Sequence, residues 1–444
     1  METKDLTQGS ITKSLLVVAI PTIISMLLQL SYNMVDMYFL GIFDKTGGAI
    51  SSVATASLFI SFAYAFNFLS TTGTGIKVSH QIGEKDYDDF FIYVNTGLKL
   101  TAIIALICGL IFNLFGRELV LFSNLQEEII VENSILYLRI YGFTIIFYSF
   151  NSLFVRIMTS MGESIRALII TAVGFVINIV LNYLLIVVFE KGILGASIAS
   201  LVGNMIVTFI FYIDQKSIFS FKKEHQFNMS YFKSILKLGA PYTLQIFLFS
   251  VIGLLSGRTL IGFGSSVIAG QKLGAQIETI TIMVTSGLLT SMSAFVGQNY
   301  GACEFKRIKE SYKICLFIGL AYVFVTSFIF FFYSDNIIRI FVNNEEVIKY
   351  AKHYLWFVAI GQSFAVLEVV GNGLYNGIGK PIIAGAISVT ITPFRLVISA
   401  LLKGSLGAIA VFVGILVTTV VKGVLSFSIY FLKVRKTLTS EMIE

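Results

Sequence analysis

The sequence predicts an all-α integral membrane protein with 12 transmembrane helices, arranged as two six-helix lobes related by a pseudo-two-fold axis along the membrane normal. Three observations predict this fold class. The composition is too apolar for a soluble chain, twelve long apolar stretches follow one another, and the second half of the sequence repeats the first.

The composition excludes several classes of protein. Of the 444 residues, 56% are hydrophobic and 13% are charged, and the mean hydropathy is +0.85. A soluble domain is about half apolar and about a quarter charged, and disordered chains combine low hydrophobicity with high charge. Three cysteines without CxxC spacing, and three histidines that lie away from them, predict no zinc site. We expect no cofactor.

Each membrane span needs roughly 20 mostly apolar residues. The first apolar run is too long for a signal peptide, so we expect it to be retained as a span. The expected spans are about 14–40, 51–78, 91–115, 133–158, 164–189, 192–214, 231–257, 265–296, 308–333, 349–377, 381–403 and 406–432.

The distribution of Lys and Arg predicts the orientation of the spans. With the N-terminus inside, 19 of these residues fall at cytoplasmic ends and loops and 8 fall on the opposite side. Cytoplasmic loops carry the excess of basic residues, so both termini should be cytoplasmic, in a multi-pass protein of the plasma (inner) membrane. The net charge of +7 follows from this bias, and we expect the lipid bilayer and no nucleic acid as a partner.

The chain contains an internal repeat. "KSLLVVAIP", which ends at Pro21, matches "KSILKLGAP", which ends at Pro241, and Gly162 and Gly379 close corresponding loops. Matches in order at nearly constant offset indicate duplication, and halves of six spans both enter from the same side of the membrane. The repeat favours a transporter.

This duplication predicts three parts of the chain: an N-terminal lobe (1–214, spans 1–6), a cytoplasmic linker (215–230) and a C-terminal lobe (231–444, spans 7–12). The linker is the longest polar stretch. We expect a monomer.

Ionisable residues inside spans cost several kcal/mol to insert, so each is a functional candidate. The central ones are Asp36, Glu278, Glu368 and Arg395, and the less central ones are Lys99, Arg139, Lys272 and Lys422.

A polar set in the N-terminal lobe lies at similar depth in three spans. Asn178 and Asn182 are spaced i,i+4 and share one face of span 5, while Asp36 lies in span 1 and Ser200 in span 6. One carboxylate with neutral oxygens suits a small hard cation, and a buried carboxyl also suits a proton. The alternatives are interhelical hydrogen bonding for the asparagines, close packing for Ser200 and an exposed position for Asp36.

The polar residues of the C-terminal lobe allow two interpretations. We expect a structural ion pair between Arg395 and Glu278 or Glu368, and the alternative is a site for a cationic substrate. Gln245 in span 7 is a further candidate for the lining of a substrate cavity.

Pro21 and Pro241 occupy matching positions about two turns into spans 1 and 7. Proline removes a helical hydrogen bond, so these sites are either static kinks or hinges that bend during transport. Pro393, inside span 11, could act similarly.

Four motifs resemble those of the multidrug and toxic compound extrusion (MATE) family of cation-coupled antiporters. They are "VDMYFLG" in span 1, "NIVLNYLL" in span 5, "VGQNYGA" at Val296–Ala302 and "GLYNGIGKP" before span 11. The resemblance covers nearly the whole chain.

The resemblance implies export of amphipathic, cationic drugs or toxic compounds in exchange for Na+ or H+ by alternating access. It implies a coupling-ion site, and a metal site if the ion is Na+, at Asp36, Asn178 and Asn182, joined by Ser200 and the backbone carbonyl of Ala196. Some members carry an acid where Asn182 stands or in span 7, and this chain carries neither. Glu368 stands where many members have glutamine.

The sequence leaves three rival functions. A lipid-linked oligosaccharide flippase shares the architecture, but its cavity would be more cationic than the acidic Glu278 and Glu368 suggest. A membrane enzyme would need a catalytic cluster, which the sequence does not offer, so we expect no enzyme. A channel would not need duplicated proline hinges.

Overall fold

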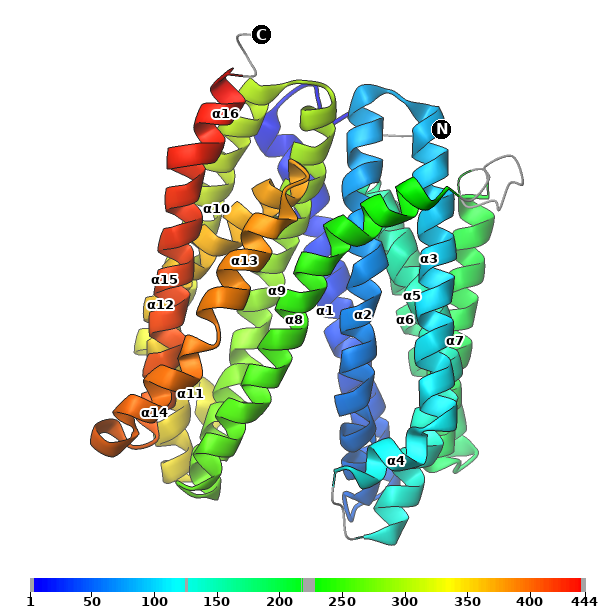
Figure 1. Cartoon of the computed structure of the whole chain (residues 1–444). Coiled ribbons are helices and arrows are strands. Elements are labelled where there is room, and N and C mark those ends of the chain that lie inside the picture. The colour runs from blue at the N-terminus through cyan, green and yellow to red at the C-terminus, as the bar shows by residue number, and fades with distance from the viewer. Residues whose placement is uncertain (1–3, 124–126, 217, 219–227, 441–444) are drawn as a thin grey trace. The chain divides into compact units, whose positions relative to one another are not determined.

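The computed structural model describes residues 4–123, 127–216, 218 and 228–440, so most of the expected linker at 215–230 lies outside the described residues. Twelve helices in this part of the chain are long and apolar enough to cross a membrane, which confirms the predicted number of spans. Figure 1 labels them in chain order.

The helices of the first half of the chain are α1 (Ile11–Phe43), α2 (Gly48–Glu84), α3 (Tyr87–Leu114), α4 (Gly116–Leu121), α5 (Glu128–Ser160), α6 (Ser164–Asn182), the π-helical η1 (Tyr183–Val188) and α7 (Gly192–Asp214). Those of the second half are α8 (Met229–Ile261), α9 (Ser265–Gly301), α10 (Phe305–Phe332), α11 (Ser334–Arg339), α12 (Glu345–Gly377), α13 (Pro381–Ile391), α14 (Phe394–Leu406), α15 (Ile409–Ile429), the π-helical η2 (Tyr430–Val434) and α16 (Arg435–Ser440).

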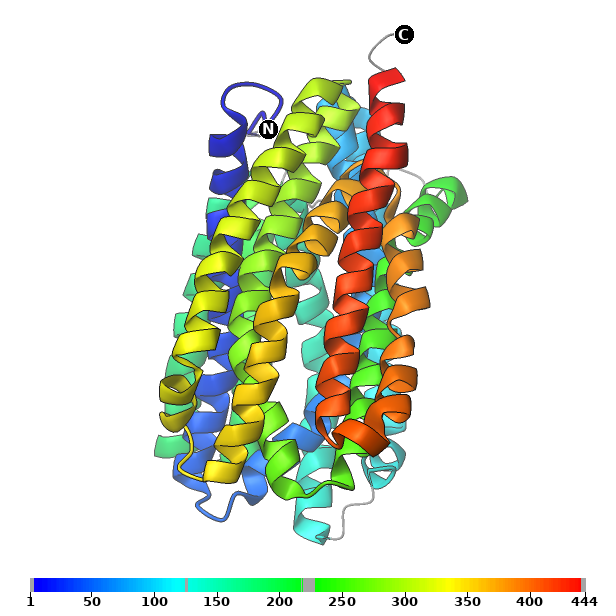
Figure 2. The ribbon, with the colours of Figure 1, turned by 90° about the vertical axis from the view of Figure 1, so that its left-hand side faces the viewer.

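The backbone repeats along the chain as the sequence does. The helices α2 and α9 both have 37 residues, α3 and α10 have 28, and α5 and α12 have 33. The turns after α5 and α12 both use a glycine in the left-handed region, Gly162 at φ 81° and Gly379 at φ 70°, where a side chain would be strained. Corresponding helices of the two halves also pack against corresponding neighbours. Helix α5 packs against α2, α3 and α7. Helix α12 packs against α9, α10 and α15, which Figure 2 shows in front.

Contacts divide the chain into two compact units. The N-terminal unit contains Ile20–Thr243, and the C-terminal unit contains Leu6–Ala19 and the chain from Leu244 onward. This division differs from a cut at the linker. The first segment of α1, up to Ala19, belongs to the C-terminal unit, and the first segment of α8, up to Thr243, belongs to the N-terminal unit. Leu15 belongs to the core of the C-terminal unit, where its carbonyl accepts a hydrogen bond from Ser291 Oγ at 2.6 Å.

The exchange points lie beside the two prolines that the sequence singled out. The units change between Ala19 and Ile20, next to Pro21, and between Thr243 and Leu244, two residues after Pro241. Both prolines lie inside continuous helices.

The expected span at 381–403 is interrupted. Helix α13 ends at Ile391 and α14 begins at Phe394, with Thr392 and Pro393 between them. Proline has no N–H for the helical ladder, and it interrupts the helix as its chemistry predicts.

Large apolar side chains cover the outer faces of the helices. Leu114, Phe324 and Leu401 are 67%, 75% and 77% exposed. A bilayer accommodates such side chains, whereas a soluble protein rarely exposes so many together. The chain is therefore a multi-pass membrane protein.

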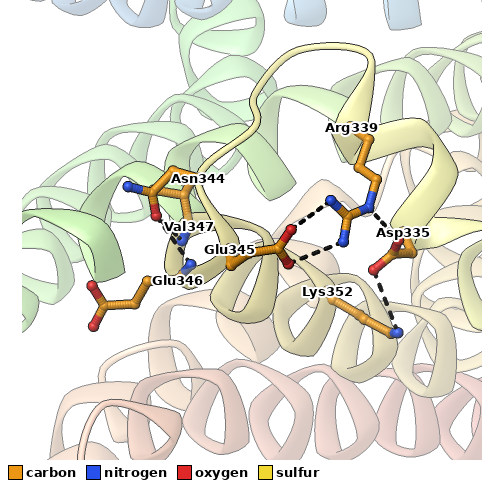
Figure 3. A network of polar contacts seen from close by, with 7 residues as sticks. All are labelled: Asp335, Arg339, Asn344, Glu345, Glu346, Val347 and Lys352. Atoms are coloured by element: carbon orange, nitrogen blue, oxygen red, sulfur yellow. Dashed lines mark hydrogen bonds and ion pairs between the residues drawn. The ribbon is translucent and has the colours of Figure 1, made fainter.

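A polar network fixes the turn between α11 and α12 (Figure 3). Arg339 donates to Asp335 at 2.7 Å and to both oxygens of Glu345 at 2.7 and 3.0 Å. Asn344 caps α12 by accepting from the backbone N–H groups of Glu346 and Val347. The guanidinium thus joins the short helix α11 to the first turn of α12.

Candidate functional site

The carboxylate of Asp36 lies inside the N-terminal unit. It sits in the mostly apolar helix α1 and is 5% exposed. In the described part of the chain, no Lys, Arg or His forms an ion pair with it. A buried carboxylate without a cationic partner is costly, so its remaining neighbours determine what the site can hold.

Two neutral side chains donate to the Asp36 carboxylate. Asn182 Nδ2 donates to Oδ1 at 2.5 Å, and Ser200 Oγ donates to Oδ2 at 3.3 Å. The Asn182 amide is also 3.0 Å from Asn178 Oδ1. The structure thus brings together all four side chains that the sequence predicted, from α1, α6 and α7, and each is at most 5% exposed.

Two buried polar atoms of the asparagines have no hydrogen-bond partner. They are Asn182 Oδ1 and Asn178 Nδ2. The oxygen is an open acceptor beside a carboxylate, and a ring of carboxylate, amide and hydroxyl oxygens is the kind of shell that a hard cation takes. The donor set therefore fits a small cation.

Ala196, whose backbone carbonyl the resemblance implies as a further ligand, lies in α7. It is fully buried one turn before Ser200, within the regular part of α7. There its carbonyl faces the N–H of Ser200 in the helical ladder. Among the described residues, no hydrogen bond from another helix reaches the Ala196 carbonyl.

Sequence reasoning missed two tyrosines near the carboxylate. Tyr32 and Tyr137 both lie within electrostatic range of Asp36. The Tyr32 hydroxyl is buried without a hydrogen-bond partner, and a Cβ placed on Gly203 of α7 would be 3.7 Å from it. The i,i+4 spacing of Tyr32 and Asp36 was the available signal for the first tyrosine. Tyr137, in α5, had none.

The helix also changes type at the site. Helix α6 ends at Asn182, and the π-helical η1 begins at Tyr183. Short π-helical segments shift the register of the hydrogen-bond ladder and often occur at functional sites. No pattern in the sequence predicted this segment.

In the C-terminal unit, the expected ion pair of Arg395 is wrong. Glu368 instead pairs with Lys422 of α15 at 2.9 Å, and Ser388 donates to the same carboxylate at 3.2 Å. Lys422 can reach Glu368 because their helices, α15 and α12, pack against each other. This buried pair fulfils the structural role predicted for Arg395.

The other polar candidates of the C-terminal unit make few polar contacts. Tyr354 donates to Glu278 at 2.5 Å. The Arg395 guanidinium stacks on the Phe249 ring, 5.5 Å from its centroid. Gln245 Oε1 is buried without a hydrogen-bond partner.

The described residues contain no group of three or more His, Cys, Asp or Glu that could hold a metal ion. The oxygens around Asp36 are mostly neutral and come from amide and hydroxyl groups. Such a set suits a transported monovalent cation better than a tightly held structural metal.

Comparisons with known proteins place the chain in a family. The family model described as MatE matches residues 21–184 and, separately, residues 241–401. The two matches begin at Pro21 and Pro241, so the model recognises each half of the chain. This agrees with the internal repeat in both position and extent.

Curated relatives match over most of their length. The chain is 23% identical to a probable multidrug resistance protein NorM of Thermotoga maritima, over 98% of this chain and 96% of the relative. It is 22% identical to the multidrug export protein MepA of Staphylococcus aureus, over 90% of this chain and 86% of the relative. These relatives are named as multidrug transporters and not as enzymes.

Solved structures share the fold. A MATE structure in complex with MaD3S has a TM-score of 0.90 at 18% identity, with both chains covered completely. A multidrug resistance MATE family transporter in an outward-facing conformation has a TM-score of 0.87 at 18% identity, again over 100% of both chains. Because the family model matches both halves and most of the sequence, the chain belongs to the MatE family of multidrug efflux transporters.

Proposed function

We propose that the protein exports amphipathic compounds that carry a cationic group, in exchange for a coupling cation that binds at Asp36. The single observation that carries this proposal is the buried Asp36 carboxylate, held by Asn182 and Ser200 without a cationic partner among the described residues. Burying an uncompensated charge is unfavourable, so a cation that enters the site removes a large energetic cost. That difference can bias one conformation over another.

Na+ is the proposed coupling ion, and H+ is the alternative. The open acceptor Asn182 Oδ1 supports Na+, because a proton on Asp36 would need no further oxygen ligands. A proton would be held by the carboxylate alone. The two ions therefore differ in how strongly coupling depends on the asparagines.

Loading of the site would favour the inward-facing state and release the substrate outward. One charge that crosses 100 mV contributes about 2.3 kcal/mol. Exchange of one monovalent cation for another moves no net charge, so the ion's own gradient would then drive export. Two ions per substrate, or an electrically neutral substrate, would add the membrane potential.

The proposal includes two structural expectations. Both chain termini lie in the cytoplasm, as the bias of Lys and Arg predicts. Helix α1 bends near Pro21 when the site loads, because this proline lies beside the residue where α1 passes from one unit to the other. Pro241 is the corresponding position in α8.

The test is dye export from proteoliposomes in which the Na+ and pH gradients are set independently. Wild-type protein should export a cationic dye under an inward Na+ gradient at equal pH, and Asp36→Asn should abolish that dependence. Asp44→Asn is the matched control, because Asp44 lies in the exposed turn after α1 and caps α2 through Ala49. Gradient-driven export that survives Asp36→Asn unchanged would overturn the assignment.

A further inference from the structure

Arg395 is a buried guanidinium without a polar partner. It is 6% exposed, and its Nε has no hydrogen-bond acceptor. In the described part of the chain, the guanidinium forms no hydrogen bond and no ion pair, and it lies over the Phe249 ring, 5.5 Å from the ring centroid. A guanidinium carries five N–H donors, and leaving them unused in the interior is unfavourable.

The backbone beside Arg395 does not offer comparable open donors. The N–H of Arg395 donates to the Thr392 carbonyl at 3.1 Å, and the N–H of Leu396 donates to the Pro393 carbonyl at 3.1 Å. These two N–H groups in the first turn of α14 are therefore satisfied within the chain. The donors that remain without an acceptor here are those of the Arg395 side chain.

Of the two acids near Arg395, one is neutralised and one is not. Glu368 pairs with Lys422. Glu278 accepts from the Tyr354 hydroxyl and has no cation within ion-pair distance among the described residues. Glu278 and Arg395 interact electrostatically without forming an ion pair. Among the described residues, the unit thus contains one positive and one negative group that lie near each other, and neither forms an ion pair.

The two groups lie at similar depth. Glu278 is about 20 Å along α9 from its first residue, and Arg395 is about 17 Å from the last residue of α14, at 1.5 Å per residue. Those two helix ends are neighbours, because Lys403 of α14 stacks on Phe263 in the turn before α9 at 5.4 Å. The charges therefore share one level of the C-terminal unit.

The internal repeat places Arg395 at the position that Asn178 has in the first half of the chain. It follows Asn178 by 217 residues, the offset that also separates Gly162 from Gly379. In the N-terminal unit this position carries an amide of the cation site. In the C-terminal unit it carries a fixed positive charge, which repels a cation and attracts an oxyanion.

We propose that Arg395 and Glu278 form a subsite for zwitterionic substrates, with the carboxylate of the substrate on Arg395 and its cationic group against Glu278. This inference rests on the proposed export function and specifies its substrate class. Arginine and a carboxylate form strong, charge-assisted hydrogen bonds, and the Phe249 ring holds the guanidinium plane in position. Gln245 lies one turn before Phe249 on α8, and its free oxygen adds an acceptor on the same face.

The test is dye binding to the purified full-length protein in detergent, followed by fluorescence anisotropy. Rhodamine 110 carries a free carboxylate and a delocalised cation, and rhodamine 123 is its methyl ester and carries the cation alone. Wild type should bind rhodamine 110 at least about tenfold more tightly, as expected for hydrogen bonds to a charged group. Arg395→Gln should remove this preference while rhodamine 123 binding persists.

Three variants separate a recognition role from a structural one. Arg395→Lys should keep part of the preference, because it retains the charge but not the planar fork. Glu278→Gln should weaken both dyes, which share the cation. Lys403→Gln is the matched control. This exposed lysine belongs to the same unit and, like Arg395, lies over an aromatic ring, and its substitution should not change the preference for rhodamine 110.

The subsite would be overturned if the wild type bound the two dyes with equal affinity or bound neither. It would also be overturned if Arg395→Gln lost binding of both dyes equally and Arg395→Lys showed no preference for rhodamine 110. Transport separates this inference from the proposed function. Gradient-driven export of rhodamine 123 with equal dye affinities would exclude the subsite alone. Preferential binding of rhodamine 110 without export under either gradient would exclude the proposed function alone.

Discussion

Asn182 and Asp36 are joined across α6 and α1 by a hydrogen bond of 2.5 Å, in which the amide Nδ2 donates to carboxylate Oδ1. The same amide reaches Asn178 Oδ1 at 3.0 Å. Asn182 therefore both stabilises the carboxylate and holds the two asparagines together. Its own oxygen stays open, which places an acceptor beside the charge.

Substitution of Asn182 by leucine should weaken activation by the coupling ion. The change removes the open acceptor Asn182 Oδ1, which the proposed Na+ site uses as an oxygen ligand, and polar contacts with a charged group contribute about 1.5–3 kcal/mol. We expect the half-saturating Na+ concentration for dye export to rise by about tenfold or more. An unchanged half-saturating Na+ concentration would show that Asn182 takes no part in binding the coupling ion.

Substitution of Ser200 by alanine should have a smaller effect. Its hydroxyl donates to Asp36 at 3.3 Å, which is long for an O–H donor. We expect the half-saturating Na+ concentration to rise a few-fold, corresponding to about 0.5–1.5 kcal/mol. Ser197→Ala is the matched control on α7, because Ser197 donates to the carbonyls of Ile193 and Leu194 in its own helix. An equal effect of both variants would count against a role of the Ser200 hydroxyl at the site.

The buried pair of Glu368 and Lys422 should behave as a unit. Both side chains are 9% exposed, and their charged atoms are 2.9 Å apart. Removal of one partner leaves a buried charge and costs about 3–5 kcal/mol, whereas replacement of both by apolar residues is often neutral. We expect Lys422→Met to lower the thermal unfolding midpoint in detergent and the double variant with Glu368→Met to recover most of it. Additive losses in the double variant would contradict a coupled pair.

The network at the start of α12 should contribute stability that depends on pH. The Arg339 guanidinium lowers the pKa of Asp335 below its ordinary value of 3.8. A lowered pKa means that the contribution is present above pH 3.8 and is lost as the pH falls through the lowered value. Wild type should therefore exceed Asp335→Asn in thermal midpoint at pH 7, by about 1 °C for exposed pairs. The difference should vanish in acid.

Glu346 offers the control for this network. It lies next to Glu345, and its carboxylate points away from Arg339 (Figure 3). Glu346→Gln should leave the thermal midpoint unchanged, whereas Glu345→Gln should lower it. The same shift in both variants would indicate a general charge effect rather than the network.

Much of the fold could be predicted because membrane insertion imposes simple rules on sequence. Apolar length predicted the twelve spans, and the match of Pro21 with Pro241 predicted the duplication. The exchange of the first segments of α1 and α8 was not predictable, because it depends on contacts between helices and not on hydropathy. The short helices α4 and α11 were missed since each has only six residues.

The N-terminal site was predictable for a local reason, and the C-terminal polar groups were not. Asn178 and Asn182 share a helix face at any packing, so their meeting with Asp36 required only that the helices be neighbours. The partner of Glu368 depends on the rotation of α15 about its own axis. Sequence spacing does not fix that rotation. The sequence therefore favoured the more central Arg395 over Lys422 as the partner of Glu368.

The first segment of α8 is held against α2 by close backbone contact, and a single methyl group should test this. A Cβ on Gly239 would lie 2.0 Å from the Leu69 carbonyl oxygen, whereas a Cβ on Gly253 of the same helix would meet no atom within 4 Å. A rigid backbone atom cannot yield as a side chain does, and overpacking costs about 1–3 kcal/mol. Gly239→Ala should lower the thermal midpoint by several degrees, and Gly253→Ala should match wild type. A Gly239→Ala protein with the midpoint and dye export of wild type would show that α8 does not pack here as closely as these contacts require.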